Sequence, residues 1–214
     1  MTSATTNQAT LPRLILLTDR VAAGTRSRTL TETVREAVTG GARAVLLREK
    51  GLPRPERRRL LDTIQELLDS VGGIVGVASD VALAIQAGIG WVHLAQLDPL
   101  VDPDLHLIVG RSCHDTTETG RAAGEACAYV TMSPVELTSS KPGYGPALGV
   151  EGLAAAVRAA PSVRVFALGG VTPDNTADWL GAGAYGIAVM GSIMGARDPA
   201  AITASFLAAL EGVV

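Results

Sequence analysis

The stretch Ala182-Gly-Ala-Tyr-Gly-Ile-Ala-Val-Met-Gly-Ser192 contains the unit from which we predict the fold. Gly183 can adopt the left-handed conformation that commonly ends a helix, and the apolar run at 185–190 is typical of a buried strand. Gly191-Ser192 then begins another short helix. Three more segments have the same order of helix end, glycine and strand: Gly40-Gly-Ala-Arg-Ala-Val, Ala87-Gly-Ile-Gly-Trp-Val and Ala123-Gly-Glu-Ala-Cys-Ala-Tyr-Val.

Outward from these units, the chain reads as eight short apolar strands that are mostly separated by helices. We expect strands at 14–18, 44–48, 74–78, 91–94, 107–110, 128–132, 162–168 and 185–190, and helices at 29–39, 55–71, 80–86, 116–126 and 199–210. Nearly continuous apolar strands indicate a parallel sheet that is covered on both faces. The pattern predicts an α/β protein with a single (β/α)8 TIM barrel. An open doubly wound sheet is the alternative, and the lack of an obvious edge strand disfavours it.

Length and composition agree with one domain of this kind. The chain has 214 residues, and a TIM barrel needs roughly 200 or more. We expect a flexible, polar N-terminal tail at 1–12 that is not a signal peptide, followed by the barrel at 13–214. A net charge of -3 without a basic stripe disfavours nucleic-acid binding, and no apolar run is long enough for a membrane span. Two cysteines without metal-ligand spacing are expected to be reduced thiols of a cytoplasmic protein.

Polar residues follow the predicted strands. In a TIM barrel such positions meet at one mouth, formed by the carboxyl ends of the strands. The residues expected there are Asp19 and Arg20, Arg48 to Lys50, Ser79 and Asp80, His93 with Gln96 and Asp98, Arg111 to His114, the loop at 133–149, Gly169-Gly170 and Met190 to Ser192.

Two glycine-containing turns predict a phosphate site. Gly169-Gly170 follows the seventh strand, and Gly191-Ser192 follows the eighth. Loops after these two strands frequently bind phosphate in this fold, because their backbone N–H groups can approach an anion closely. Either turn could serve only as a connector, but the two together favour a phosphorylated small-molecule ligand.

Three cationic side chains could bind the same ligand. Arg48 and Lys50 alternate on an extended segment and therefore face the same side, although Glu49 could neutralise them as a surface pair. Lys141 lies in the hydroxyl-rich loop Thr138-Ser-Ser-Lys-Pro-Gly-Tyr-Gly-Pro, which could close over a ligand or remain solvated. Guanidinium and ammonium groups are well suited to phosphate.

The remaining polar residues each allow two interpretations. Ser112 could donate a hydrogen bond to phosphate or cap the next helix. His93 and His114 are more often structural at such positions than catalytic. Asp80 and Asp98 could bind Mg²⁺, but Asp80 could also cap a helix and Asp98 could start a turn.

The ordered motifs resemble the thiamine phosphate synthase and thiazole tautomerase family over about residues 14–210. The resemblance is carried by Arg48-Glu-Lys50, Arg111-Ser-Cys-His114, Ser133-Pro134 through Ser140-Lys-Pro-Gly143, Gly169-Gly-Val-Thr-Pro173 and Gly186-Ile-Ala-Val-Met190. It implies a barrel fold and coupling of a thiazole phosphate to a pyrimidine diphosphate, with release of pyrophosphate assisted by Mg²⁺.

The same resemblance implies a role for each matching residue. It assigns Arg48, Lys50, Ser112 and Lys141 to the diphosphate, with the last three as catalytic residues. It assigns Gly170, Gly191 and Ser192 to the thiazole phosphate and Asp98 to Mg²⁺, and we expect Gly169 to bind phosphate as well.

The chain departs from the synthase pattern where the family binds pyrimidine and metal. Leu46 replaces a glutamine, Ala78 an asparagine, Ser79 a metal-binding aspartate and Leu97 a glutamate. A single remaining carboxylate predicts weakened Mg²⁺ binding.

These departures resemble the tautomerase branch, whose proton transfer needs no metal. That branch, however, has a histidine early in the sixth-strand loop, where this chain has Pro134. His93 and Glu136 are candidate substitutes for it. We expect a divergent synthase; the alternatives are a tautomerase-like isomerase and a non-catalytic regulatory protein that binds thiazole or thiamine phosphate. Homodimerisation is left open.

Overall fold

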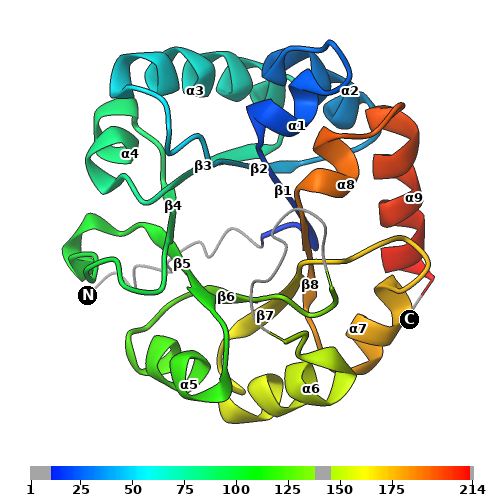
Figure 1. Cartoon of the computed structure of the whole chain (residues 1–214). Helices are drawn as coiled ribbons and strands as arrows, with labels where there is room; N and C mark the ends of the chain where they lie inside the picture. The colour runs from blue at the N-terminus through cyan, green and yellow to red at the C-terminus, as the bar shows by residue number, and fades with distance from the viewer. Residues whose placement is uncertain (1–10, 138–145, 213–214) are drawn as a thin grey trace.

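A computed structural model describes residues 11–137 and 146–212, and it forms a closed barrel of parallel strands (Figure 1). Each strand pairs with the next along the chain, and β1 pairs with β8, which closes the sheet. This closure confirms the predicted TIM barrel and excludes the open sheet. The strands are β1 Leu14–Leu17, β2 Ala44–Leu47, β3 Ile74–Ala78, β4 Trp91–Leu94, β5 Ile108–Cys113, β6 Tyr129–Met132, β7 Arg164–Leu168 and β8 Gly186–Val189.

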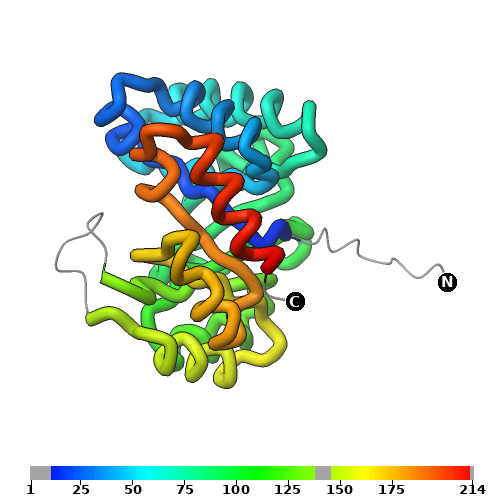
Figure 2. The backbone as a smooth tube through the Cα atoms, turned by 90° about the vertical axis from the view of Figure 1, so that its right-hand side faces the viewer, coloured from blue at the N-terminus to red at the C-terminus, as the bar shows by residue number. Residues whose placement is uncertain are grey.

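The helices form a ring around the strands, and α9 runs along the outside of the barrel (Figures 1 and 2). Aspartate or threonine side chains cap the amino ends of several of them, as Thr29 does with a capping box at α2. The helices are α1 Arg20–Gly24, α2 Leu30–Thr39, α3 Arg54–Asp69, α4 Val81–Ala87, η1 Pro103–Leu105 (a 3-10 turn), α5 Thr116–Gly124, α6 Gly149–Ala159, α7 Thr176–Gly181, α8 Gly191–Met194 and α9 Pro199–Glu211.

Two apolar cores lie on the two faces of the sheet. The larger core fills the space between strands and helices. The smaller core fills the barrel itself, and its largest side chains are Trp91, Tyr129 and Phe166. Gly110 leaves room for Tyr129, because a Cβ at this position would overlap the phenol ring. Tyr129 on β6 can therefore reach across β5 to the residues of β4.

The structure corrects the sequence prediction at several elements. β5 extends three residues beyond the predicted end at 110, because Arg111, Ser112 and Cys113 pair in register with β6. The helices α1, α6 and α7 were not predicted.

At the amino end, Leu11 lies within the segment expected to be a tail, but it is buried in the barrel core and its carbonyl accepts a hydrogen bond from Tyr185. Within the described ranges, no helix combines the length and apolar character that a membrane crossing requires.

Candidate functional site

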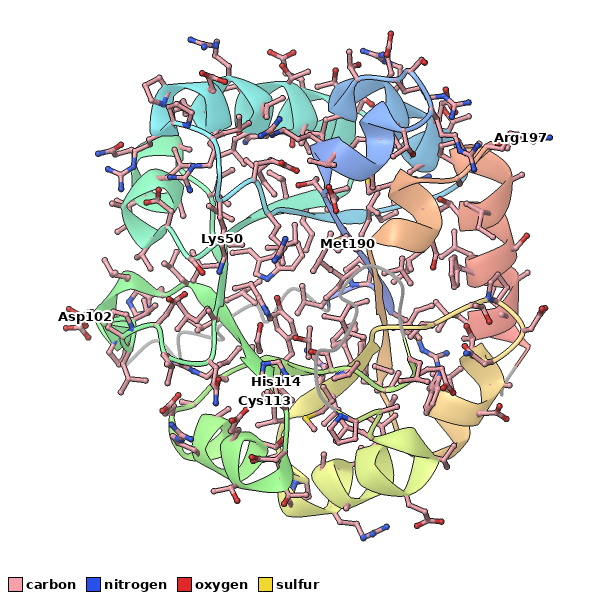
Figure 3. The ribbon with its side chains drawn as sticks, in the orientation of Figure 1. Lys50, Asp102, Cys113, His114, Met190 and Arg197 are labelled. Carbon is pink, nitrogen blue, oxygen red and sulfur yellow. The ribbon has the colours of Figure 1, made fainter. Side chains whose placement is uncertain are left out.

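A cavity of about 750 Å³ opens at the carboxyl ends of the strands. It brings together predicted phosphate-binding residues that follow β2, β7 and β8, namely Arg48, Gly169, Gly170, Gly191 and Ser192. In the view along the barrel axis, Lys50, His114 and Met190 lie within the ring of helices, whereas Asp102 and Arg197 lie outside it (Figure 3). The predicted convergence of the two glycine turns and a cation is therefore present.

In the turn after β7, the backbone carbonyls are hydrogen-bonded and the backbone N–H groups point the opposite way. Gly169 and Gly170 have φ angles of 92° and 72°, a conformation that glycine adopts at little cost. The Gly169 carbonyl accepts from the Glu136 N–H at 3.0 Å, and the Gly170 carbonyl accepts from Asn175 Nδ2 at 3.1 Å. In a trans peptide the N–H points opposite to the carbonyl. The N–H groups of Gly170 and Val171, which have no partner among the described residues, are thus available to an anion in the cavity.

Asn175 holds this turn in place, and sequence reasoning missed it. Its Oδ1 accepts hydrogen bonds from the Thr172 N–H at 2.8 Å and from Trp179 Nε1 at 3.0 Å, while its Nδ2 binds the Gly170 carbonyl. The available signal was an asparagine three residues after Thr172, since asparagine side chains commonly stabilise turns by bonding to nearby backbone.

The turn after β8 is joined to the first turn by Ser192. Its hydroxyl donates to the Val171 carbonyl at 3.1 Å, so the side chain braces one turn against the other. Gly191 and Ser192 are the first residues of α8, and N–H groups at the start of a helix have no partner within it. The backbone of Ser192, rather than its hydroxyl, is therefore the part that can face an anion.

Arg48 and Lys50 continue the inward face of β2. Leu46 points into the barrel core, so the alternate residues Arg48 and Lys50 follow on the same side. Glu49 does not neutralise them: it is buried and accepts a hydrogen bond from the Arg20 N–H at 3.1 Å, and burial raises the pKa of its carboxyl. Within the described ranges, neither Arg48 nor Lys50 forms an ion pair with a carboxylate. Arg48 lines the cavity, whereas Lys50 is not among its lining residues.

Ser112 lies on the inward face of β5, beside the buried His93. The Ser112 Oγ is 3.0 Å from His93 Nε2, and His93 Nδ1 is 2.9 Å from the Tyr129 hydroxyl. Burial, reinforced by the positive charge of Lys50, lowers the pKa of His93 to about 3. The ring is therefore neutral at physiological pH. Ser112 and His93 are not among the residues that line the cavity.

Arg111 and Cys113 face away from the mouth, contrary to their placement among the mouth residues. Cys113 packs in the outer core because side chains alternate along a strand. Arg111 forms an ion pair with Glu125 at 2.8 Å and donates to the carbonyls of three residues after β4, the last of them Asp98. It therefore braces the loop that carries Asp98.

Two aspartates that could have bound metal already have partners. Asp80 caps α4 through the Leu83 N–H and pairs with Arg54 and Arg57 at 3.0 and 2.7 Å. Burial acts to raise its pKa, but these hydrogen bonds and cations outweigh burial, and the pKa is lowered. Asp98 uses its Oδ2 to accept from the Ala95 N–H at 2.7 Å.

Ser79 stands next to Asp80, in a left-handed conformation with φ of 55°. Its Oγ is buried without a hydrogen-bond partner. The part of the chain that the structure describes contains no group of three histidine, cysteine or acidic side chains arranged for a metal ion.

The loop after β6 is only partly described. Ser133, Pro134 and Leu137 line the cavity, and His114 Nδ1 donates to the Ser133 carbonyl at 2.7 Å, which ties the start of the loop to the end of β5. Lys141 lies outside the described residues, so its predicted role stays a prediction.

Comparisons with known proteins show which family the chain is similar to. The family model described as thiamine monophosphate synthase matches residues 14–193. The thiamine-phosphate synthase of Moorella thermoacetica is 36% identical over 196 residues, which cover 87% of this chain and 90% of the relative. That of Methanoculleus marisnigri is 35% identical over 185 residues, or 84% of this chain and 87% of the relative. A solved structure, thiamine phosphate pyrophosphorylase from Pyrococcus furiosus, aligns with a TM-score of 0.83 and 29% identity over 94% of this chain and 96% of that one.

Proposed function

Because this chain belongs to the thiamine monophosphate synthase family, we propose that it is a transferase that joins a thiazole phosphate to a pyrimidine diphosphate to form thiamine phosphate. The observation that carries the proposal is the cavity lined by Arg48 and two glycine turns, in which the N–H groups of Gly170 and Val171 have no partner among the described residues. Such a cavity suits a phosphorylated small molecule, and the family relationship specifies which one.

We assign the thiazole phosphate to the backbone of the turns after β7 and β8. The N–H groups of Gly170 and Val171 come from one turn, and those of Gly191 and Ser192 come from the other. Asn175 and the Ser192 hydroxyl hold the two turns in this arrangement. Because these donors are already oriented before binding, little additional ordering is needed when phosphate arrives.

We assign the diphosphate to the cationic side of the mouth. In the reaction, the thiazole nitrogen forms a bond to the methylene carbon of the pyrimidine substrate, the carbon–oxygen bond to the diphosphate breaks, and pyrophosphate leaves with the electron pair. The protein must therefore stabilise negative charge that develops on the leaving group. Arg48 and Lys50 supply positive charge that no carboxylate of the described residues pairs with, and Ser112 supplies a hydroxyl. Lys141 is the further cation that the resemblance assigns.

A Mg²⁺ ion would neutralise further charge on the leaving diphosphate. Mg²⁺ commonly binds through one or two carboxylates together with substrate phosphate oxygens and water, so a single carboxylate is a sufficient if minimal protein contribution. Asp98 would hold the ion, because it accepts one backbone hydrogen bond through Oδ2, whereas both carboxylate oxygens of Asp80 are paired with arginines. Ser79, which precedes Asp80, offers only a hydroxyl. We therefore expect Mg²⁺ to bind weakly until the diphosphate is present.

The synthase names of the relatives favour coupling over tautomerisation. The test is to incubate the purified protein with the pyrimidine diphosphate and the thiazole phosphate, with and without Mg²⁺, and to measure thiamine phosphate and released pyrophosphate. We expect equal amounts of both products. Absence of product together with tight thiazole phosphate binding would instead support a regulatory binding protein, and NMR of the thiazole carboxylate phosphate in the same samples would detect tautomerisation.

A further inference from the structure

Four side chains joined by hydrogen bonds lie directly beneath the mouth, and none of them is among the residues that line the cavity. Trp91 Nε1 donates to the Tyr129 hydroxyl at 3.0 Å, Tyr129 contacts His93 Nδ1 at 2.9 Å, and His93 Nε2 contacts Ser112 Oγ at 3.0 Å. Trp91, Tyr129 and His93 are buried, and only Ser112 is partly exposed. The chain therefore runs from the barrel core to the mouth.

The directions of these hydrogen bonds follow from the donors that each group has. Trp91 can only donate, so it uses one acceptor site of the Tyr129 oxygen. The phenol proton of Tyr129 then needs an acceptor, and among the described residues His93 Nδ1 is the one within reach. An unbonded buried hydroxyl proton is unfavourable, so Nδ1 accepts and the proton of the neutral ring lies on Nε2.

The Nε2–H group in turn determines what Ser112 can do. It donates to Ser112 Oγ, with a longer contact of 3.5 Å to Thr131 Oγ1. The hydroxyl proton of Ser112 is thereby directed away from His93. Since Ser112 is the member of the chain that reaches the mouth, its proton is presented to whatever binds there.

The surroundings keep the His93 ring neutral and hold the four hydrogen-bonded side chains in place. The charged groups that act on His93 are Lys50, Arg111 and Arg48, which disfavour protonation, and Asp98, which favours it. Burial and the three cations prevail. The Tyr129 ring lies over Gly110 and packs edge-on against Phe166, with ring centroids 5.4 Å apart, so the phenol has little freedom to turn away from His93.

We propose that Trp91, Tyr129 and His93 act as a positioning relay that fixes Ser112 as a hydrogen-bond donor toward the mouth, so that the site selects a ligand with a proton-free acceptor at this point. The identification of that acceptor as a diphosphate oxygen rests on the proposed function. The relay itself does not. Trp91, Tyr129 and His93 are positioning residues, and Ser112 is the residue that touches the ligand.

The first test is the protonation state of the His93 ring in the ligand-free protein. The chain has three histidines, and replacing His106 and His114 with glutamine leaves His93 as the only source of ring signals. In ¹⁵N-histidine-labelled protein we expect an unprotonated Nδ1 and a protonated Nε2, unchanged down to about pH 5. A proton on Nδ1, or a charged ring at neutral pH, would overturn the relay whatever the protein catalyses.

The second test is a double-mutant cycle with inorganic pyrophosphate as the probe, measured by calorimetry. Tyr129→Phe removes the phenol proton but keeps the ring, which frees His93 to accept from Ser112 and turns the serine proton inward. We expect Tyr129→Phe and Ser112→Ala each to weaken pyrophosphate binding about tenfold or more, and the double variant to be no worse than Ser112→Ala alone. Ser112→Thr, which keeps the hydroxyl, should restore binding.

A matched control separates positioning from general loss of packing. Tyr185→Phe makes the same chemical deletion in the same aromatic cluster, but the Tyr185 hydroxyl bonds the Leu11 carbonyl and has no link to Ser112. We expect wild-type pyrophosphate affinity from this control. An undiminished effect of Tyr129→Phe in the Ser112→Ala background would refute the relay. A protein with the expected His93 tautomer and pyrophosphate affinity that forms no thiamine phosphate would refute the proposed function alone.

Discussion

Replacing Gly170 with alanine should damage both stability and phosphate binding, for reasons that can be quantified. A Cβ at this position would lie 2.5 Å from the Cβ of Glu136 and 2.9 Å from its carbonyl carbon. The backbone φ of 72° adds about 1–2 kcal/mol for any residue with a Cβ. Displacing a packed neighbour adds about 1–3 kcal/mol, and the less flexible unfolded chain returns about 0.4–1 kcal/mol. The free energy of unfolding should therefore fall by about 1–4.6 kcal/mol.

The effect of the same substitution on binding follows from the position of Glu136. Its N–H holds the Gly169 carbonyl, so a shift of Glu136 also turns the N–H of Gly170 away from the cavity. Loss of one hydrogen bond to a charged phosphate amounts to about 1.5–3 kcal/mol, or roughly tenfold to a hundredfold in affinity. Urea denaturation at constant m-value gives the first quantity, and calorimetry with the thiazole phosphate gives the second.

Gly181→Ala is the matched control for this experiment. Gly181 lies in α7, and a Cβ there would meet no atom within 4 Å. Because Gly181 is the last residue of α7, this change should alter the free energy of unfolding by less than the roughly 0.5–1 kcal/mol expected in a helix interior, and it should leave affinity unchanged. If Gly170→Ala behaved like Gly181→Ala, the turn after β7 would not be the constrained anion site that we infer.

Three further perturbations test other parts of the mouth. Arg48→Lys keeps the positive charge but loses the planar guanidinium, so the pyrophosphate affinity measured by calorimetry should fall about tenfold while the denaturation midpoint is unchanged. Equal affinity would contradict a bidentate role of Arg48. Ser79→Asp adds a carboxylate at a left-handed backbone position that aspartate tolerates, so less Mg²⁺ should be needed for half-maximal turnover. Ser79→Asn should leave the Mg²⁺ requirement unchanged. The free energy of unfolding should fall as the pH drops from about 6.5 toward 3, by up to about 1.4 kcal/mol per pH unit, because His93 binds a proton in the unfolded chain but stays neutral in the folded protein. His93→Gln should reduce this pH dependence in urea denaturation. An unchanged pH dependence would refute a buried neutral ring.

The fold was predictable because each strand is marked by its own short stretch of sequence. The predicted bounds of β3 and β4 match the structure, since both are apolar runs between clear turn signals. The end of β5 was missed because Arg111 and Ser112 are polar, and only their pairing with Val130 and Thr131 identifies them as strand. The helix α6 begins after Leu148 without a side-chain cap, so no start signal is visible in the sequence there. The helix α7 begins after Asn175, a residue type favoured at helix starts, but its side chain bonds the turn after β7 instead of the helix end.

The site was predictable only where it is made of short motifs. Arg48 and the two glycine turns were identifiable because strand ends converge in a barrel, whatever the contacts are. Asn175 and Tyr129 were not identified. The first acts through a turn whose shape is set by positive φ angles, and the second bonds to a residue 36 positions away across Gly110. Contacts of this kind depend on tertiary packing and leave no local signal.

Under the assignments that we propose, the thiazole phosphate half of the mouth consists of backbone groups and the diphosphate half consists of side chains. The thiazole phosphate half presents backbone N–H groups, and its side chains serve only to hold the turns, as Asn175 and Ser192 do. The proposed diphosphate half depends on side chains, and Leu46 on β2 and Ser79 after β3 are positions at which the resemblance to the synthases implies a replacement. Substitution on this second side changes charge and hydrogen bonding directly. Differences in metal requirement should therefore arise from the diphosphate half, whereas recognition of the thiazole phosphate should resemble that of the relatives.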